Sequence, residues 1–192
     1  MAIIAATGLE TLSLREVARR LSVSHQAPYR HFPSRDHILS AVVARAFDHF
    51  SAYLDSRQQV PDNPAQDLRG MGLAYLSYAD EHPLQYRLMF ATPLPNPADH
   101  PGMMQSARHA FTLLEQGVAR MRATQGQPCT EELVTLDALF IWAALHGLAG
   151  IRGGCAITTL RLSSDILGQA PAHLLGRIGQ AMGNPCGAKA DG

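Results

Sequence analysis

The chain has 192 residues, of which 46% are hydrophobic, and its 16 basic and 16 acidic residues leave no formal net charge. Such a chain can bury a core in one or two globular domains. No apolar run approaches the roughly 18 residues of a membrane span, and the start MAIIAA lacks the basic flank and the length of a secretory signal. We therefore expect a soluble, cytoplasmic protein without membrane contact. Cys129, Cys155 and Cys186 lie far apart without zinc or redox spacing, so we expect reduced thiols, no metal and no cofactor.

Basic residues gather near the N-terminus. Between Ser13 and His37, five arginines stand against Glu16 and Asp36, a net charge of +3; the arginines are Arg15, Arg19, Arg20, Arg30 and Arg35. A charge excess of this size is usually only a solvated face, so it does not indicate nucleic-acid binding by itself.

Two short helices are predicted in the same stretch. Ser13-Leu-Arg-Glu16 has the form of a capping box and predicts a helix from about residue 14 to 21. Ser22-Val-Ser24 interrupts the pattern, and Ser24 is a good cap for a second helix running to about Phe32. Pro28 would then be the fourth residue inside that helix, where at most one backbone bond is lost.

These residues resemble the helix-turn-helix of the TetR family of bacterial transcriptional regulators. The resemblance is carried by LSLREVARRL from Leu12, by Val23-Ser24, and by APYRHFPSRDHIL from Ala27 to Leu39. A second match, Trp142-Ala-Ala-Leu-His146-Gly147 together with His82 to Phe90, resembles the TetR C-terminal subtype named for its Trp-His-Gly signature. The resemblance implies an all-α fold, with a three-helix DNA-binding domain followed by a helical domain for ligand binding and dimerisation. We expect the domains at residues 1–56 and 57–183, followed by a loose tail at 184–192.

The resemblance also implies roles in DNA binding. The second helix of such motifs enters the major groove with its leading turn against base edges. Gln26 can pair with adenine, His25 can reach guanine, and Ala27 or Pro28 can contact a thymine methyl group. Tyr29 and Arg35 would hold phosphates. The full set of candidate DNA-contacting residues is Ser13, Ser24, His25, Gln26, Ala27, Pro28, Tyr29, His31 and Arg35.

Structural roles compete with several of these assignments. His31 and Phe32 fit packing better than DNA contact, whereas Gln26, Tyr29 and Arg35 fit DNA contact better. The predicted core of the motif consists of Val17, Ala18, Leu21 and Val23. Ser22 stands where the family often has glycine. Serine is less favourable than glycine for a tight turn at this position.

The rest of the chain is predicted to be helical, without strands. Periodicity and breakers predict helices at 34–56, around 68–82, at 86–90, and at about 103–123, 131–151 and 171–183, with a loop over TPLPNPADHPG. Apolar side chains on these helices form the candidate binding site for an unknown small-molecule effector: Met71, Tyr75, Tyr78, Met89, Phe90, Phe111, Leu114, Trp142 and His146. Stripes of this kind are equally consistent with plain core.

Two helices are candidates for self-association. Ala143, Gly147 and Gly150 allow close backbone approach, and the last helix offers Leu174, Leu175, Ile178 and Met182. In the family such helices form a four-helix bundle between two subunits, and a homodimer suits two DNA half-sites. Packing within one chain remains the alternative.

Catalysis is not expected. His146 with Cys155 or Asp137 has no motif context, and no histidine pair lies in a recognised ligand pattern. The sequence therefore predicts a dimeric, ligand-responsive regulator that binds double-stranded palindromic operator DNA. We expect a repressor rather than an activator. The alternative is a TetR-like ligand-binding protein without a DNA role. Met1 lies only twelve residues before Ser13, so we also expect a truncated first helix and a weakened DNA-binding domain.

Overall fold

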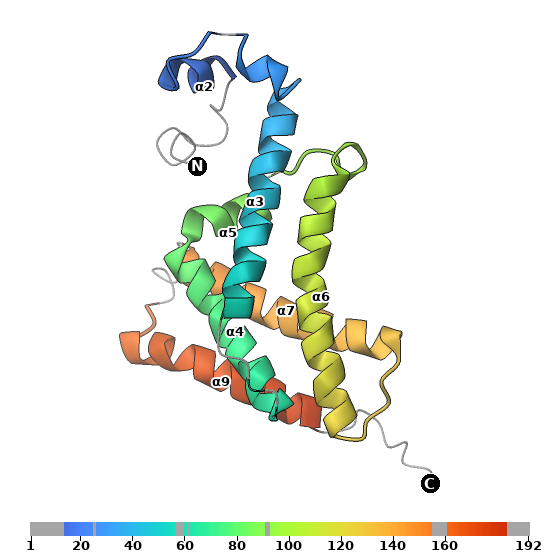
Figure 1. Cartoon of the computed structure of the whole chain (residues 1–192). Helices are drawn as coiled ribbons and strands as arrows, with labels where there is room; N and C mark the ends of the chain where they lie inside the picture. The colour runs from blue at the N-terminus through green and yellow to red at the C-terminus, as the bar shows by residue number, and fades with distance from the viewer. Residues whose placement is uncertain are drawn as a thin grey trace. The chain divides into compact units, whose positions relative to one another are not determined.

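The computed structural model describes residues 14–24, 26–56, 60, 62–90, 93–154 and 161–183, and within these ranges every regular element is a helix (Figure 1). The predicted all-α class is therefore confirmed. The chain divides into two compact units, one formed by residues 1–49 and 84–108 and the other by residues 50–83 and 109–192. Ser13, His25, the expected truncated helix, Cys155 and the tail from residue 184 lie outside the described residues.

The first unit contains α2 (Leu14–Arg20), the single turn η1 (Pro28–Arg30) and the first part of α3 (Arg35–Ser56). Ser34 caps α3, because its hydroxyl accepts the backbone N–H of His37 at 3.4 Å. The predicted long helix at 34–56 is thus confirmed. Residues Leu39, Val43, Ala46 and Phe47 form its buried stripe in this unit.

The same unit includes most of α5 (Pro83–Phe90), the turn η2 (Pro97–Asp99) and the start of α6 (Pro101–Thr124). Phe90 of α5 meets Phe47 of α3 edge to face, with ring centroids 5.7 Å apart. Asn96 caps η2 by accepting the N–H of Ala98 at 3.3 Å. The expected loop before residue 103 therefore contains one capped turn.

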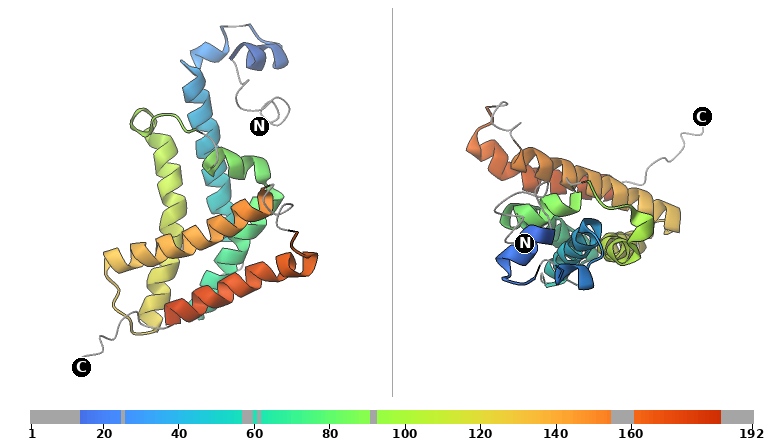
Figure 2. Two further views of the ribbon diagram at one scale, coloured as in Figure 1. Left: turned by 180° about the vertical axis from the view of Figure 1, so that it is seen from behind. Right: turned by 90° about the horizontal axis from the view of Figure 1, so that it is seen from above.

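The second unit is built from α4 (Pro64–Glu81), the later part of α6, α7 (Glu131–Gly153) and α9 (Ser164–Gly183). α4, α7 and α9 pack against one another, as the front and back views show (Figures 1 and 2). The approach of α4 to α9 is close, since a Cβ atom added at Gly72 would lie 2.5 Å from Leu175 Cδ2. Glycine at position 72 therefore allows these two helices to touch.

The last helix differs from the prediction. We expected it at 171–183, but α9 begins at Ser164 and carries Pro171 in its interior. Ser163 caps this earlier start by accepting the N–H of Ile166 at 3.3 Å. Pro171 removes one backbone bond, and the buried residues Leu175, Ile178 and Met182 hold the helix in place despite that loss.

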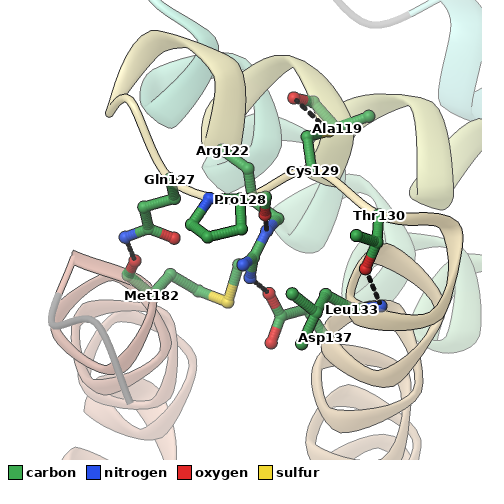
Figure 3. Close-up of polar contacts among 9 residues, drawn as sticks. All are labelled: Ala119, Arg122, Gln127, Pro128, Cys129, Thr130, Leu133, Asp137 and Met182. Atoms are coloured by element: carbon green, nitrogen blue, oxygen red, sulfur yellow. Dashed lines mark hydrogen bonds and ion pairs between the residues drawn. The ribbon is translucent and has the colours of Figure 1, made fainter. Parts of the chain in front are cut away.

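A cluster of hydrogen bonds fixes the connection between α6 and α7 (Figure 3). The guanidinium of the buried Arg122 donates from Nε to the carbonyl oxygen of Pro128 at 2.7 Å and forms an ion pair with Asp137 of α7. The side chain of Gln127 donates to the carbonyl of Met182 on α9 at 2.8 Å. Thr130 caps α7. The loop is therefore tied to three helices of its own unit.

Candidate nucleic-acid interface and effector site

Residues 14–36, called the reader segment below, begin with α2 and a tight turn. The N–H of Val23 donates to Ala18 O at 3.1 Å, and the N–H of Ser22 donates to Arg19 O at 3.2 Å. These two bonds form a Schellman motif, in which the residue after the helix is left-handed and usually glycine. Ser22 takes that position, with φ at 54°. The tight turn thus forms with serine, at the backbone cost of a left-handed non-glycine residue.

The second helix of the motif is shorter than predicted. Instead of a helix over residues 24–32, the described residues show a turn and then one 3-10 turn at Pro28–Arg30. Pro28 has no N–H to donate, and the N–H of Ala27 bonds to Ser24 O at 3.0 Å in a four-residue turn. Only Phe32, whose N–H lies 2.8 Å from Pro28 O, adds a bond of helical spacing. Pro28 therefore divides the segment into short turns.

The side chains of this segment have two kinds of environment. Gln26, Tyr29 and Arg30 are exposed, and Tyr29 leaves 51% of its surface open. Pro28 is buried, which favours packing over contact with a base. The remaining described candidates are exposed at Ser24, His31 and Arg35 and half-buried at Ala27. An exposed amide, phenol and guanidinium can all donate hydrogen bonds to nucleic acid.

The predicted core of the motif is correct only in part. Ala18 is fully buried, but Leu21 is 64% exposed and Val23 is 45% exposed. Both follow Arg20, the last helical residue, so neither continues the helical face that buries Ala18. The side chain of Val17 is outside the described part.

Glu16 of α2 is paired with two arginines of the same helix. The carboxylate of Glu16 accepts three hydrogen bonds of 2.7 to 2.8 Å, two from Arg19 and one from Arg20. These bonds lower the pKa of Glu16 to about 2 and raise the pKa of Arg19. The carboxylate is therefore ionised throughout the physiological pH range. Sequence reasoning counted these charges but missed the pairing, although the i, i+3 and i, i+4 spacings suit it.

The second unit brings four predicted effector residues together. The indole N–H of Trp142 donates to the hydroxyl oxygen of Tyr75 at 3.2 Å, and that hydroxyl lies 3.1 Å from Nδ1 of His146. The ring of Phe111 stands 6.0 Å from that of Trp142. Burial lowers the pKa of His146, which keeps the imidazole neutral. α4 and α7 thus share a relay of neutral hydrogen-bonding groups, Trp142 to Tyr75 to His146.

The other predicted effector residues lie elsewhere or have different partners. Tyr78 is fully buried, and burial raises its pKa to about 12. Phe50 of α3, which is not in the predicted effector set, lies between Tyr78 and Tyr75, with its ring centroid 4.9 Å from the first and 5.4 Å from the second. Met71 and Leu114 are half-buried. Met89 and Phe90 belong to the first unit, whereas the relay lies in the second unit.

Family models match most of the chain. The model for bacterial regulatory proteins of the tetR family matches residues 1–42, and the model for the tetracyclin repressor-like C-terminal domain matches residues 68–165. The chain belongs to the TetR family. The finer assignment to the Trp-His-Gly subtype stays a prediction.

Individual proteins agree with this family. An HTH-type transcriptional regulator of Mycobacterium bovis is 29% identical over 90 residues, which cover 46% of this chain and 38% of that protein. The match thus spans less than half the length of this curated relative. A TetR-family regulatory protein from Rhodococcus RHA1 has the same fold, with a TM-score of 0.68, 19% identity, and coverage of 95% of this chain and 92% of the other. A Rhodococcus sp. RHA1 protein of unknown function superposes with a TM-score of 0.75 at 21% identity, over 94% of this chain and 90% of that one.

Family membership settles the general class. TetR-family proteins are transcription factors rather than enzymes, and the curated relative is named as a regulator. The curated relative that this TetR-family chain matches in part is named as an HTH-type transcriptional regulator. The individual DNA and effector contacts stay predictions.

Proposed function

We propose that this TetR-family protein is a dimeric, effector-responsive repressor that acts in the cytoplasm and binds palindromic operator DNA through its reader segment. The observation that carries the proposal is the exposure of Gln26, Tyr29 and Arg30 together around the buried Pro28. These three side chains place an amide, a phenol and a guanidinium at one turn, where each can donate a hydrogen bond to DNA. On DNA, Gln26 would read a base edge, while Tyr29 and Arg35 would fix the register on phosphates.

The dimer would form through one face of α7. Leu136, Phe140, Ala143, Gly147 and Gly150, which we call the α7 stripe, are all exposed, and a Cβ atom at either glycine would meet nothing within 4 Å. Leu136 is 55% exposed and Phe140 49%. A stripe of this kind is the usual sign of a protein interface.

Part of the predicted dimer surface is not available. Leu175, Ile178 and Met182 of α9 are buried within their own unit, so for them the alternative of packing within one chain holds. Among the described helices α7 is also the one whose length and composition would suit a membrane span. We attribute its exposed apolar residues to the dimer contact, because one relative is named as a transcriptional regulator and another as a bacterial regulatory protein of the tetR family.

The effector would bind in the second unit at the relay of Trp142, Tyr75 and His146. Its binding would favour a conformation in which the two readers no longer fit their half-sites. Near-complete switching between the two states needs about 5.5 kcal/mol of differential affinity.

A second candidate is a TetR-like ligand-binding protein without DNA binding. One observation favours it: the second element of the reader is a single 3-10 turn among the described residues. Selection of bound duplexes from a random DNA library by the purified protein separates the two. The repressor predicts enrichment of a palindrome, whereas failure to enrich any sequence would leave the second candidate.

A further inference from the structure

The arginines of the reader segment fall into two groups. Arg19 and Arg20 share the carboxylate of Glu16, which lies at i−3 and i−4 from them. Arg15 and Arg30 are exposed and form no ion pair within the described part of the chain. Among the described residues, the reader segment therefore holds two arginines with an ion pair, Arg19 and Arg20, and two without one, Arg15 and Arg30.

The geometry of the first group matters for phosphate binding. Arg19 donates from Nε to Oε2 of Glu16 at 2.8 Å and from Nη2 to Oε1 at 2.7 Å. This is the two-pronged face that a guanidinium would otherwise offer to a phosphate. Arg20 uses its Nε on the same carboxylate at 2.7 Å. While these bonds hold, Arg19 cannot bind a phosphate through Nε and Nη2. The carboxylate of Glu16 also neutralises one of the two positive charges of Arg19 and Arg20.

We propose that Glu16 lowers the sequence-independent affinity of the reader segment for DNA by withholding Arg19 and Arg20 from phosphates, and so raises its specificity for the operator. The inference rests on the proposed function. Phosphate contacts supply nearly all non-specific binding, and they strengthen binding to every sequence alike. An acid that limits their number raises the ratio of specific to non-specific affinity.

The withholding persists under ordinary conditions. The pKa of Glu16 is held at about 2 by its hydrogen bonds to Arg19 and Arg20. The carboxylate therefore remains an anion in any buffer used for DNA binding. Exposed ion pairs are individually weak and salt-sensitive, so a phosphate can compete with Glu16, and the effect is measured best as a change in salt dependence.

The test is the salt dependence of binding to a mixed-sequence duplex by the full chain and by Glu16→Gln. Between about 50 and 200 mM salt, the slope of log K against log salt should steepen in the variant by about 0.9 if one arginine is released and about 1.8 if both are. Asp36→Asn is the control, because Asp36 is an exposed acid of the same segment with no ion pair among the described residues. This control adds the same charge and should change the slope by less than half as much.

A second set of variants separates release of arginines from a general charge effect. Arg19→Gln with Arg20→Gln should make the slope shallower by less in the parent than in Glu16→Gln, because Glu16 partly withholds both guanidinium groups in the parent. The same pair added to Glu16→Gln should return the slope to the parent value. If circular dichroism shows that Glu16→Gln does not fold, the double arginine variant of the parent decides the question alone. A slope shallower by about 1.8 would then show that both arginines already contact phosphates, and would overturn the inference.

Each outcome has one meaning. An unchanged or shallower slope in Glu16→Gln would overturn the inference but leave the proposed function intact. So would an equal change of slope on replacing Arg19 and Arg20 in the parent and in Glu16→Gln. A parent protein that binds no duplex at any salt concentration would instead overturn the proposed function, and the inference with it.

Discussion

α2 in the reader segment and α6 in the second unit end in the same hydrogen-bonded turn with different residues at its left-handed position. At the end of α6, the N–H of Gly126 donates to Ala123 O at 3.2 Å and that of Gln127 donates to Arg122 O at 3.0 Å, with φ of Gly126 at 65°. At the end of α2 the corresponding residue is Ser22, with φ at 54°. Glycine adopts this backbone freely, whereas serine is strained there.

The two turns also differ in what supports them. Arg122, the third residue from the end of α6, binds Pro128 and Asp137 through its side chain. Ala18, at the matching position of α2, is buried but has no polar group to offer. The comparison indicates that the end of α6 is fixed in the free protein, whereas the end of α2 is held mainly by two backbone bonds. Low local stability of this kind is common in segments that order on binding.

Removing the support at the end of α6 should have the largest effect. Arg122→Ala leaves Asp137 and the carbonyl of Pro128 without their buried cation, and it should lower the free energy of unfolding by about 2 to 3 kcal/mol. Urea unfolding followed by the fluorescence of Trp142, the one tryptophan in the sequence, measures this loss. Arg120→Ala is the control, since Arg120 is half-exposed in its ion pair with Asp67 and should cost less than about 1 kcal/mol. Equal losses in the two variants would contradict this account of Arg122.

Changing the left-handed residue of α6 should have a smaller effect. A Cβ atom at Gly126 would meet nothing within 4 Å, so Gly126→Ala isolates the backbone cost, expected at about 1 to 2 kcal/mol. Gly102 lies in the first turn of α6 with equal space around it, but without positive φ. Gly102→Ala should therefore stabilise the protein by up to about 1 kcal/mol. The same urea measurement serves both variants. Destabilisation by both would show that positive φ is not the cause of the loss in Gly126→Ala.

Acid should separate the two regions. The folded pKa of His146 lies below its usual value of 6.5, so the unfolded chain binds the proton more readily. Its contribution to stability is complete above pH 6.5 and is lost as the pH falls below that value. The pKa of Glu16 is about 2 against a usual 4.5, so its contribution persists until the pH falls below 4.5. Between about pH 7.5 and 5.5 the relay of the second unit should weaken while the Glu16 ion pairs remain.

His146→Gln tests the acid prediction, because it removes the titrating ring but keeps a hydrogen-bonding side chain next to Tyr75. The parent should lose more stability than this variant when urea unfolding is repeated at the lower pH. Identical losses would assign the acid sensitivity to other groups.

The sequence predicted some of these features and missed others for physical reasons. Helix periodicity and the cap at Ser34 are local signals, and α3 and α7 lie where the sequence indicates. α4 begins at Pro64, before the predicted start around residue 68, and the sequence analysis missed its cap at Asn63. α9 was predicted too short because Pro171 normally marks a boundary, and only tertiary packing overrides it. The second reader helix was predicted too long because a cap and a family pattern do not determine how far helical bonds continue around Pro28.

The candidate sites show the same limit. The sequence predicted each of the three relay residues individually. In the structure Tyr75 is buried and Trp142 and His146 are half-buried. Their hydrogen bonds join positions about seventy residues apart, which no local pattern encodes. Conversely, Glu16 with Arg19 and Arg20 is a local pattern, and helix spacing alone could have predicted that pairing.

The smallest expected effect comes from making the two turns alike. Ser22→Gly removes the left-handed strain at the end of α2 and should stabilise the reader segment by about 0.5 to 1 kcal/mol, since the two backbone bonds of the turn are kept. Ser24→Gly is the matched control, because Ser24 is exposed and does not have positive φ; there the added freedom of the unfolded chain should give no gain or a small loss. Hydrogen exchange across residues 14–24 should slow in the first variant and not in the second. If Ser22→Gly leaves exchange unchanged, the left-handed residue does not limit the stability of the reader, and the difference between the two helix ends must come from the support that Arg122 gives to α6.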